Sequence, residues 1–174
     1  MKDGIKRRKA ILKELGETEK PLSASSFAKK YDVSRQIIVG DVALLRAAGE
    51  NIIATSRGYL LERKSTQLFS KIAVQHDKNQ AEEELRTIVA AGGEIVDVIV
   101  EHPLYGELVG GLHITTQGEV DDFLKNYQSS NASFLSELTD GIHLHTIAYE
   151  TQEDFERITQ ALADKGILYK EKEA

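Results

Sequence analysis

Hydrophobic residues in the first 64 positions recur at helical spacing and then switch to the alternation typical of strands. The spacing predicts three helices, over residues 5–15, 23–31 and 35–48. Residues typical of helix ends border them: Gly16, Ser23, Ser34 and Gly49. Short apolar runs at 51–55 and 59–61 then predict a β-hairpin with its turn at 56–58. Three helices followed by a hairpin indicate a winged helix-turn-helix domain.

The same spacing predicts which side chains of this domain face its core. The expected inward-facing residues are Ile5, Leu12 and Leu15, with Lys9 near their stripe, in the first helix, Phe27 and Ala28 in the second, and Ile37, Ile38, Val42, Leu44 and Leu45 in the third.

The second half alternates between strand and helix patterns. Strands are predicted over 71–76, 94–101, 107–114 and 141–149, and helices over 79–91, 116–127 and 151–165. Pro103 predicts a loop over 102–106, because proline cannot donate to a strand ladder. The order βαββαβα predicts an α+β sandwich with helices on one face of a single sheet. The polar stretch 62–66 predicts a linker, which gives a winged-helix domain over 1–64 and a second domain over 68–174.

Charge divides at this linker. Residues 1–64 hold 14 Lys and Arg against 8 Asp and Glu, a net charge of +6, whereas residues 65–174 hold 8 against 20, a net charge of −12. Such asymmetry favours a polyanion as partner of the first domain. There is no cysteine, so a metal site would use His, Asp or Glu. No apolar run approaches a membrane span, and we expect a cytoplasmic protein with no membrane partner.

The first domain carries candidate contacts to double-stranded DNA. The second helix of a helix-turn-helix pair enters the major groove, and its first residues reach base edges. Arginine suits guanine and glutamine suits adenine at such positions. The candidate base contacts are Ser34, Arg35, Gln36 and Val39, with Arg57 at the hairpin tip, and the candidate phosphate contacts are Lys6, Arg7, Lys29 and Lys30. A winged helix used for protein contact is the alternative. Gly40 is unexpected inside a helix, where glycine costs about 1 kcal/mol.

All five histidines lie in the second domain. His143 and His145 stand two residues apart in a predicted strand, so their imidazoles project from one face and could bind zinc, nickel or a similar cation. Two ordinary sheet histidines would give the same pattern. His76 ends another predicted strand, and one of the three glutamates at 82–84 could turn back toward it. Three imidazoles and one carboxylate would form a complete ligand set without cysteine.

Motifs in both halves resemble known families. The run from Ile11 to Arg46 resembles the helix-turn-helix of small bacterial repressors. The second half resembles the three-histidine (3H) domain, and the motifs that carry this resemblance are the strand ending in His76, the segment His102-Pro-Leu-Tyr-Gly106, the strand with His113, and His143-Leu-His145. Together the two halves resemble the niacin-responsive repressors that control NAD precursor synthesis and salvage.

The resemblance implies a repressor rather than an enzyme, with nicotinic acid as co-repressor. It implies a divalent metal ion, nickel or zinc, bound by His76, Glu84, His143 and His145. On this view His102, Tyr105 and His113 are expected to contact the bound nicotinic acid. Winged-helix repressors bind paired half-sites, so a homodimer is expected. Gly40 departs from the polar residue expected on the reading helix.

Two other classes of function are open at this point. One is a repressor that senses a metal or an amino acid and has no role for niacin. The other is a winged helix fused to a metal-dependent enzyme, in which Glu101 beside His102 would act as a base. The sequence contains no Ser-His-Asp array, phosphate loop or HExxH helix, which disfavours the enzyme.

Overall fold

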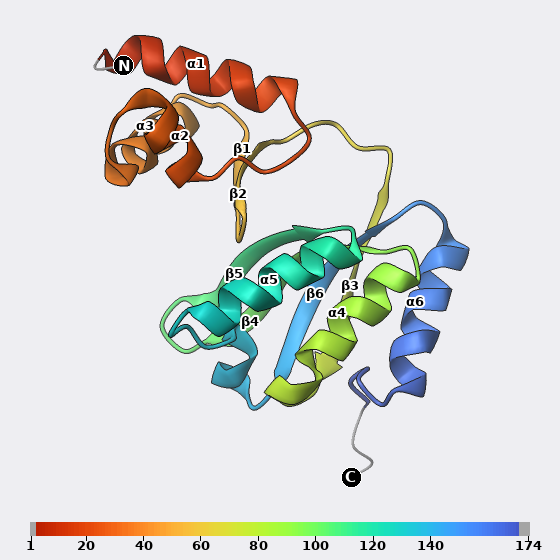
Figure 1. Ribbon diagram of the computed structural model, residues 1–174. Helices are drawn as coiled ribbons and strands as arrows, with labels where there is room; N and C mark the ends of the chain where they lie inside the picture. The colour runs from red at the N-terminus through yellow and green to blue at the C-terminus, as the bar shows by residue number, and fades with distance from the viewer. Residues whose placement is uncertain (1–2, 171–174) are drawn as a thin grey trace. The chain divides into compact units, whose positions relative to one another are not determined.

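The computed structural model describes residues 3–170 (Figure 1). The chain divides into two compact units, with the boundary between Lys64 and Ser65. Among the described residues, none of the helices has the length and apolar character needed to span a bilayer.

The first unit is a winged helix-turn-helix, as predicted. Its elements are α1 (Gly4–Glu17), α2 (Ala24–Tyr31), α3 (Arg35–Ala47), β1 (Ile52–Thr55) and β2 (Gly58–Leu61). The side chains of Ser23 and Ser34 accept hydrogen bonds from the backbone at the starts of α2 and α3. The hairpin is tied to the chain before α2 by two backbone hydrogen bonds between Leu22 and Tyr59, 2.9 and 3.0 Å long. This contact holds the wing beside the helix-turn-helix.

The predicted inward stripes of α1 and α3 were partly wrong. Ile5, Ile37 and Leu44 are 63%, 44% and 56% exposed. The buried residues are Arg7, Ile11 and Leu15 in α1 and Ile38, Asp41, Val42 and Leu45 in α3. A charged residue occupies an inward position in each helix, and a hydrophobic pattern assigns such residues to the surface. The two charges are buried because they pair with each other.

The first helix also continues through Gly16, which we had expected to end it. It stops at Glu17, and Thr18 has extended backbone angles. Leu15 is fully buried, so core packing holds the last turn in place despite the cost of a glycine.

The second unit has the predicted βαββαβα order, with two short 3-10 helices added. Its elements are β3 (Leu68–Gln75), η1 (Lys78–Gln80), α4 (Ala81–Ala90), β4 (Glu94–His102), β5 (Gly106–Ile114), α5 (Gln117–Ser129), η2 (Leu135–Thr139), β6 (Ile142–Tyr149) and α6 (Gln152–Asp164). All neighbouring strands are antiparallel, in the order β3-β6-β4-β5. Helices α4, α5 and α6 lie on one face of this sheet (Figure 1). The α+β prediction is therefore confirmed.

The core of this unit lies between the sheet and the helices. It joins Ile72, Val74, Ile95 and Ile147 of the strands to residues such as Leu85, Ile88, Ile158 and Leu162 of the helices. Strand β6 lies inside the sheet, between β3 and β4. Its His145 pairs with Ile72 and its His143 with Val74, so both imidazoles stand on the helix-covered face. The strand order thus places two titratable rings at the edge of an apolar core.

Candidate functional site

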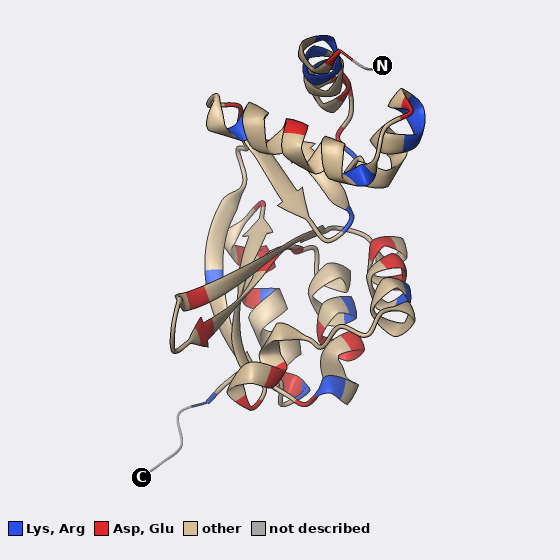
Figure 2. Cartoon of the chain, turned by 90° about the vertical axis from the view of Figure 1, so that its left-hand side faces the viewer, with Lys and Arg blue, Asp and Glu red and all other residues tan. Residues whose placement is uncertain are grey.

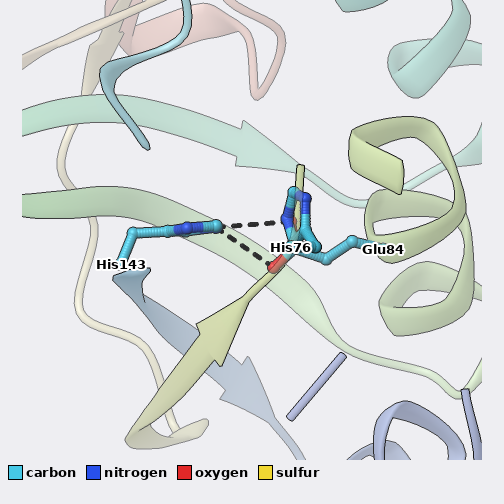
Figure 3. Close-up of side chains that lie close together, drawn as sticks. All are labelled: His76, Glu84 and His143. Carbon is cyan, nitrogen blue, oxygen red and sulfur yellow. Dashed lines mark hydrogen bonds and ion pairs between the residues drawn. The ribbon is translucent and has the colours of Figure 1, made fainter. Parts of the chain in front are cut away.

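Three imidazoles converge on the carboxylate of Glu84, which is buried in the first turn of α4. Figure 3 shows two of them, His76 and His143, beside Glu84. Its Oε2 lies 2.5 Å from His76 Nε2 and 3.4 Å from His143 Nε2. Its Oε1 lies 3.0 Å from His145 Nε2. One ligand atom each of His76, Glu84 and His143 lies within 4.8 Å of the other two. The structure therefore brings together the four residues proposed from the sequence as metal ligands.

Of the three glutamates at 82–84, Glu84 is the one that reaches the histidines. Glu82 pairs with Arg86, and Glu83 pairs with Lys165, both near the surface. Helical periodicity explains the difference, because position 84 shares the buried face of α4 with Ala81, Leu85 and Ile88.

Local backbone contacts fix the position of His76. It follows the last residue of β3, and its N–H donates to the carbonyl of Gly141 at 3.4 Å. Gly141 has φ of 84°, and a Cβ on it would lie 2.1 Å from the His76 carbonyl oxygen. Only glycine fits this close approach, which brings the start of β6 against the end of β3.

Each imidazole uses its Nδ1 on a backbone carbonyl. The acceptors are the carbonyls of Asp77 for His76 at 2.6 Å, of Gly141 for His143 at 2.9 Å, and of Asp97 for His145 at 2.6 Å. A carbonyl only accepts, so each Nδ1 carries a hydrogen. In the neutral rings each Nε2 then presents a lone pair toward the Glu84 carboxylate. Outer hydrogen bonds of this kind orient histidines that bind metals.

Two of the buried atoms that face this centre are left without a hydrogen bond within residues 3–170. Glu84 Oε1 and His145 Nε2 are buried and lie 3.0 Å apart, yet neither is aligned for a hydrogen bond with any partner among the described residues. Buried polar atoms without a hydrogen bond are rare in proteins. Three imidazole nitrogens and a carboxylate oxygen form a donor set that zinc and similar divalent ions accept. The residues present thus fit a cation.

The carboxylate and the imidazoles also shift one another's protonation equilibria. Burial raises the pKa of Glu84, but the charge of His145 and the contacts with the three imidazoles outweigh it and hold that pKa well below its usual range. Burial lowers the pKa of His76 and of His145, but the Glu84 carboxylate and a backbone carbonyl outweigh it and leave both raised. A proton bound to the Nε2 of His76 or His145 would have to dissociate before that atom could bind a metal ion.

The three residues predicted to contact nicotinic acid do not lie together. His102 ends β4, where its Nδ1 accepts hydrogen bonds from the N–H groups of Leu104 and Tyr105, and its ring lies 5.0 Å from that of Tyr105. His113 lies near the other end of β5, with its Nδ1 3.0 Å from Glu94 Oε1. His113 lies seven positions after Gly106 along the strand, a distance on the order of 20 Å. A single pocket cannot contain both histidines in this arrangement.

A cavity that sequence reasoning missed adjoins the histidine cluster. Its volume is about 480 Å³, and it is lined by residues 75–78 and by Ser136, Glu137, Asp140 and Gly141. Half of the lining comes from η2 and the loop after it, a segment with no periodic pattern or motif in the sequence. His76 belongs to both the cavity and the cluster, so a small molecule in the cavity would lie beside the proposed metal ligands.

In the helix-turn-helix, Arg35 and Gln36 are exposed at the start of α3, and Val39 is half-buried. Ser34 is the residue that caps α3. Arg57 lies in the turn of the hairpin and is half-buried. The expectation that Arg7 contacts phosphate was wrong, because its guanidinium is buried against Asp41.

Comparisons with known proteins agree with both halves. A family model described as an HTH domain matches residues 7–60, and one described as a 3H domain matches residues 69–171. The chain is 42% identical to the transcription repressor NadR of Bacillus subtilis over 172 residues, which cover 97% of this chain and 96% of that protein. It is 41% identical to the probable transcription repressor NiaR of Thermotoga maritima over 165 residues, 95% of this chain and 94% of that protein.

Proposed function

Because this chain belongs to the family of repressors that join a helix-turn-helix to a 3H domain, we propose that it represses genes of NAD precursor synthesis and salvage, with nicotinic acid as co-repressor. It is a cytoplasmic DNA-binding regulator rather than an enzyme. Its sensor holds a divalent metal ion, nickel or zinc. The observation that carries the sensor half is the convergence of three Nε2 atoms on the buried Glu84 carboxylate.

In the sensor, His76, Glu84, His143 and His145 would hold the ion. When bound, the ion supplies positive charge and a coordination position open to a carboxylate or a pyridine nitrogen. The carbonyls of Asp77, Asp97 and Gly141 keep the three rings turned toward it. Burial of all four side chains excludes water and strengthens the attraction between them and a cation.

Nicotinic acid would contact His102 and Tyr105, which lie together, and His113 at the other end of β5 would take no part in that contact. In the other unit, Ser34, Arg35, Gln36 and Val39 would read base edges, and Arg57 would contact phosphate or the minor groove. A homodimer would place two reading helices on paired half-sites of the operator.

The function is tested by operator binding with and without nicotinic acid in buffer that contains nickel or zinc. We expect nicotinic acid to tighten binding at least tenfold, a coupling of about 1.4 kcal/mol. Two compounds serve as controls. Benzoate lacks the pyridine nitrogen, and nicotinamide lacks the carboxylate. An unchanged operator affinity would remove the effector assignment, and a response to metal alone would favour the metal-sensing alternative.

Gly40 offers a separate test of the reading helix. It faces outward on α3 beside Gln36 and Ala43, which are also exposed, and among the described residues a Cβ on it would meet nothing within 4 Å beyond its own turn of helix. Gly40→Ala should stabilise the helix by about 1 kcal/mol. It should also weaken operator binding about tenfold, the effect of one poor base contact, because the methyl group intrudes where DNA approaches.

Gly16→Ala is the matched control, since Gly16 also lies in a helix with open space around its Cα. It should give the same gain in thermal stability with unchanged operator affinity. Equal operator affinity of Gly40→Ala and the wild type would show that this position does not approach DNA.

A further inference from the structure

The outward face of α3 is apolar over most of its length. After Gln36, the exposed residues along the middle of this helix are Ile37, Gly40, Ala43 and Leu44. None of them has a side-chain donor or acceptor. Beyond Arg35 and Gln36, this face therefore cannot read base pairs through hydrogen bonds.

Ile37 is the largest side chain of this face near the start of the helix. It is the third residue of α3 and is 44% exposed, whereas Ile38 beside it is fully buried. The first residues of the second helix in a helix-turn-helix reach base edges, so Ile37 stands where base contacts are made. Gly40, about one turn later, has no side chain that could cover it. Among the described residues, a Cβ on Gly40 would meet nothing within 4 Å beyond its own turn of helix.

Charges around this face indicate what would cover it. Arg35 and Arg46 lie near the two ends of α3, both are exposed, and within residues 3–170 neither forms an ion pair. The acidic residue of this helix, Asp41, is buried against Arg7. The exposed surface of α3 thus combines apolar side chains with positive charge and carries no negative charge.

The whole first unit shares this balance of charge. Figure 2 shows basic positions on the helices of the first unit, and acidic positions are more numerous in the second. An apolar segment of protein would gain nothing from the arginines that border the face. A polyanion that also presents apolar groups fits both of its properties.

Double-stranded DNA offers this combination in its major groove. Phosphates border the groove and attract the positive charge. The base pairs present hydrogen-bonding groups at its floor, and the C5 methyl group of thymine is the apolar group among them. Apolar side chains of DNA-binding proteins contact this methyl group.

We propose that Ile37 reads thymine, with its side chain packed against the C5 methyl group of a thymine in the major groove of the operator. The inference rests on the proposed function for the binding of DNA by α3. It adds to that function a specificity-determining residue that the hydrophobic pattern had assigned to the core. Arg35 and Gln36 would read neighbouring base pairs through hydrogen bonds, and Ile37 would distinguish thymine from cytosine, which lacks the methyl group.

Replacement of thymine by uracil tests the contact, because it removes the methyl group and leaves base pairing unchanged. An operator is first selected from a pool of random-sequence duplexes by the full chain, in buffer that contains nickel and nicotinic acid. Each thymine is then replaced in turn by uracil. At one thymine of each half-site we expect a loss of affinity of about fourfold, the effect of burying one methyl-sized group. Equal affinity for every uracil duplex and the parent would overturn the proposal.

The variant Ile37→Ala assigns the effect to this side chain. It should bind the thymine operator at least fourfold more weakly than the wild type, and it should bind the uracil and thymine duplexes equally. Ile5→Ala is the matched control, since Ile5 is an exposed isoleucine of α1, and it should keep the fourfold preference for thymine. Thermal unfolding of both variants checks the fold. A fourfold preference that persists in Ile37→Ala would assign the methyl contact to another residue and overturn the proposal.

The outcomes separate this inference from the proposed function. A chain that selects an operator and responds to nicotinic acid, but ignores uracil, remains a niacin-responsive repressor without the methyl contact. A chain that selects no duplex removes both the repressor function and the contact of Ile37 with thymine.

Discussion

His145→Ala should abolish tight binding of nickel and zinc while leaving the second unit folded. His145 Nε2 faces Glu84 Oε1 at 3.0 Å and has no hydrogen bond to any residue that the structure describes, so its removal deletes a donor directed at the proposed ion. Loss of an outer hydrogen-bond partner alone costs about 10–100-fold in metal affinity, and loss of a ligand should cost more. The measurement is metal content after dialysis, with circular dichroism to follow the fold.

His113→Asn is the matched control for this experiment. His113 is half-buried and pairs with Glu94, outside the cluster, and its φ of 53° is one that asparagine tolerates. It should keep full metal content. Full occupancy in both His143→Ala and His145→Ala would rule out the ligand assignment.

Asp41→Ala should unfold the winged helix without releasing metal from the sensor. Arg7 Nε lies 2.5 Å from Asp41 Oδ2, and Arg8 lies 3.3 Å from Oδ1. Removing one member of a buried ion pair costs about 3–5 kcal/mol. A unit of this size has a total stability of about 3–10 kcal/mol, so the loss is a large share of it. Operator binding should disappear because α3, which carries the reading residues, loses its link to α1.

The measurement is thermal unfolding of the full chain, with metal content and operator affinity followed in parallel. Asp41→Asn keeps the shape and one acceptor oxygen and should be intermediate. Glu17→Ala, which removes an exposed ion pair with Lys13, should change stability by less than about 0.5 kcal/mol. If Asp41→Ala unfolded no earlier than Glu17→Ala, the buried pair would not hold α1 to α3.

Much of the fold could be predicted because its signals are local. Ser23 and Ser34 begin helices through their own hydroxyl groups, and the order of strands and helices follows from periodicity. The pair His143 and His145 shares one face because of the two-residue period of a strand. These features need no knowledge of distant contacts.

The features that could not be predicted depend on contacts between distant segments. Asp41 is buried only because Arg7, 34 residues earlier, meets it. The carbonyl of Asp97 reaches His145 where β4 makes a register shift against β6 between Ile95 and Ile99. Periodicity could have distinguished Glu84 from its neighbours, because a carboxylate among the inward positions of a helix is itself a signal.

The positions of the four donors along the chain have a consequence for stability. Two of them lie at 76 and 84 and two at 143 and 145, on either side of the segment that forms β4, β5 and α5. An ion held by all four would tie these distant positions together and close a loop of roughly 60 residues, which restricts the unfolded chain as a disulfide would, by about 4 kcal/mol. In a chain that contains no cysteine, this coordination would act as a reversible cross-link. Removal of the ion by a chelator would then lower the free energy of unfolding of the whole second unit.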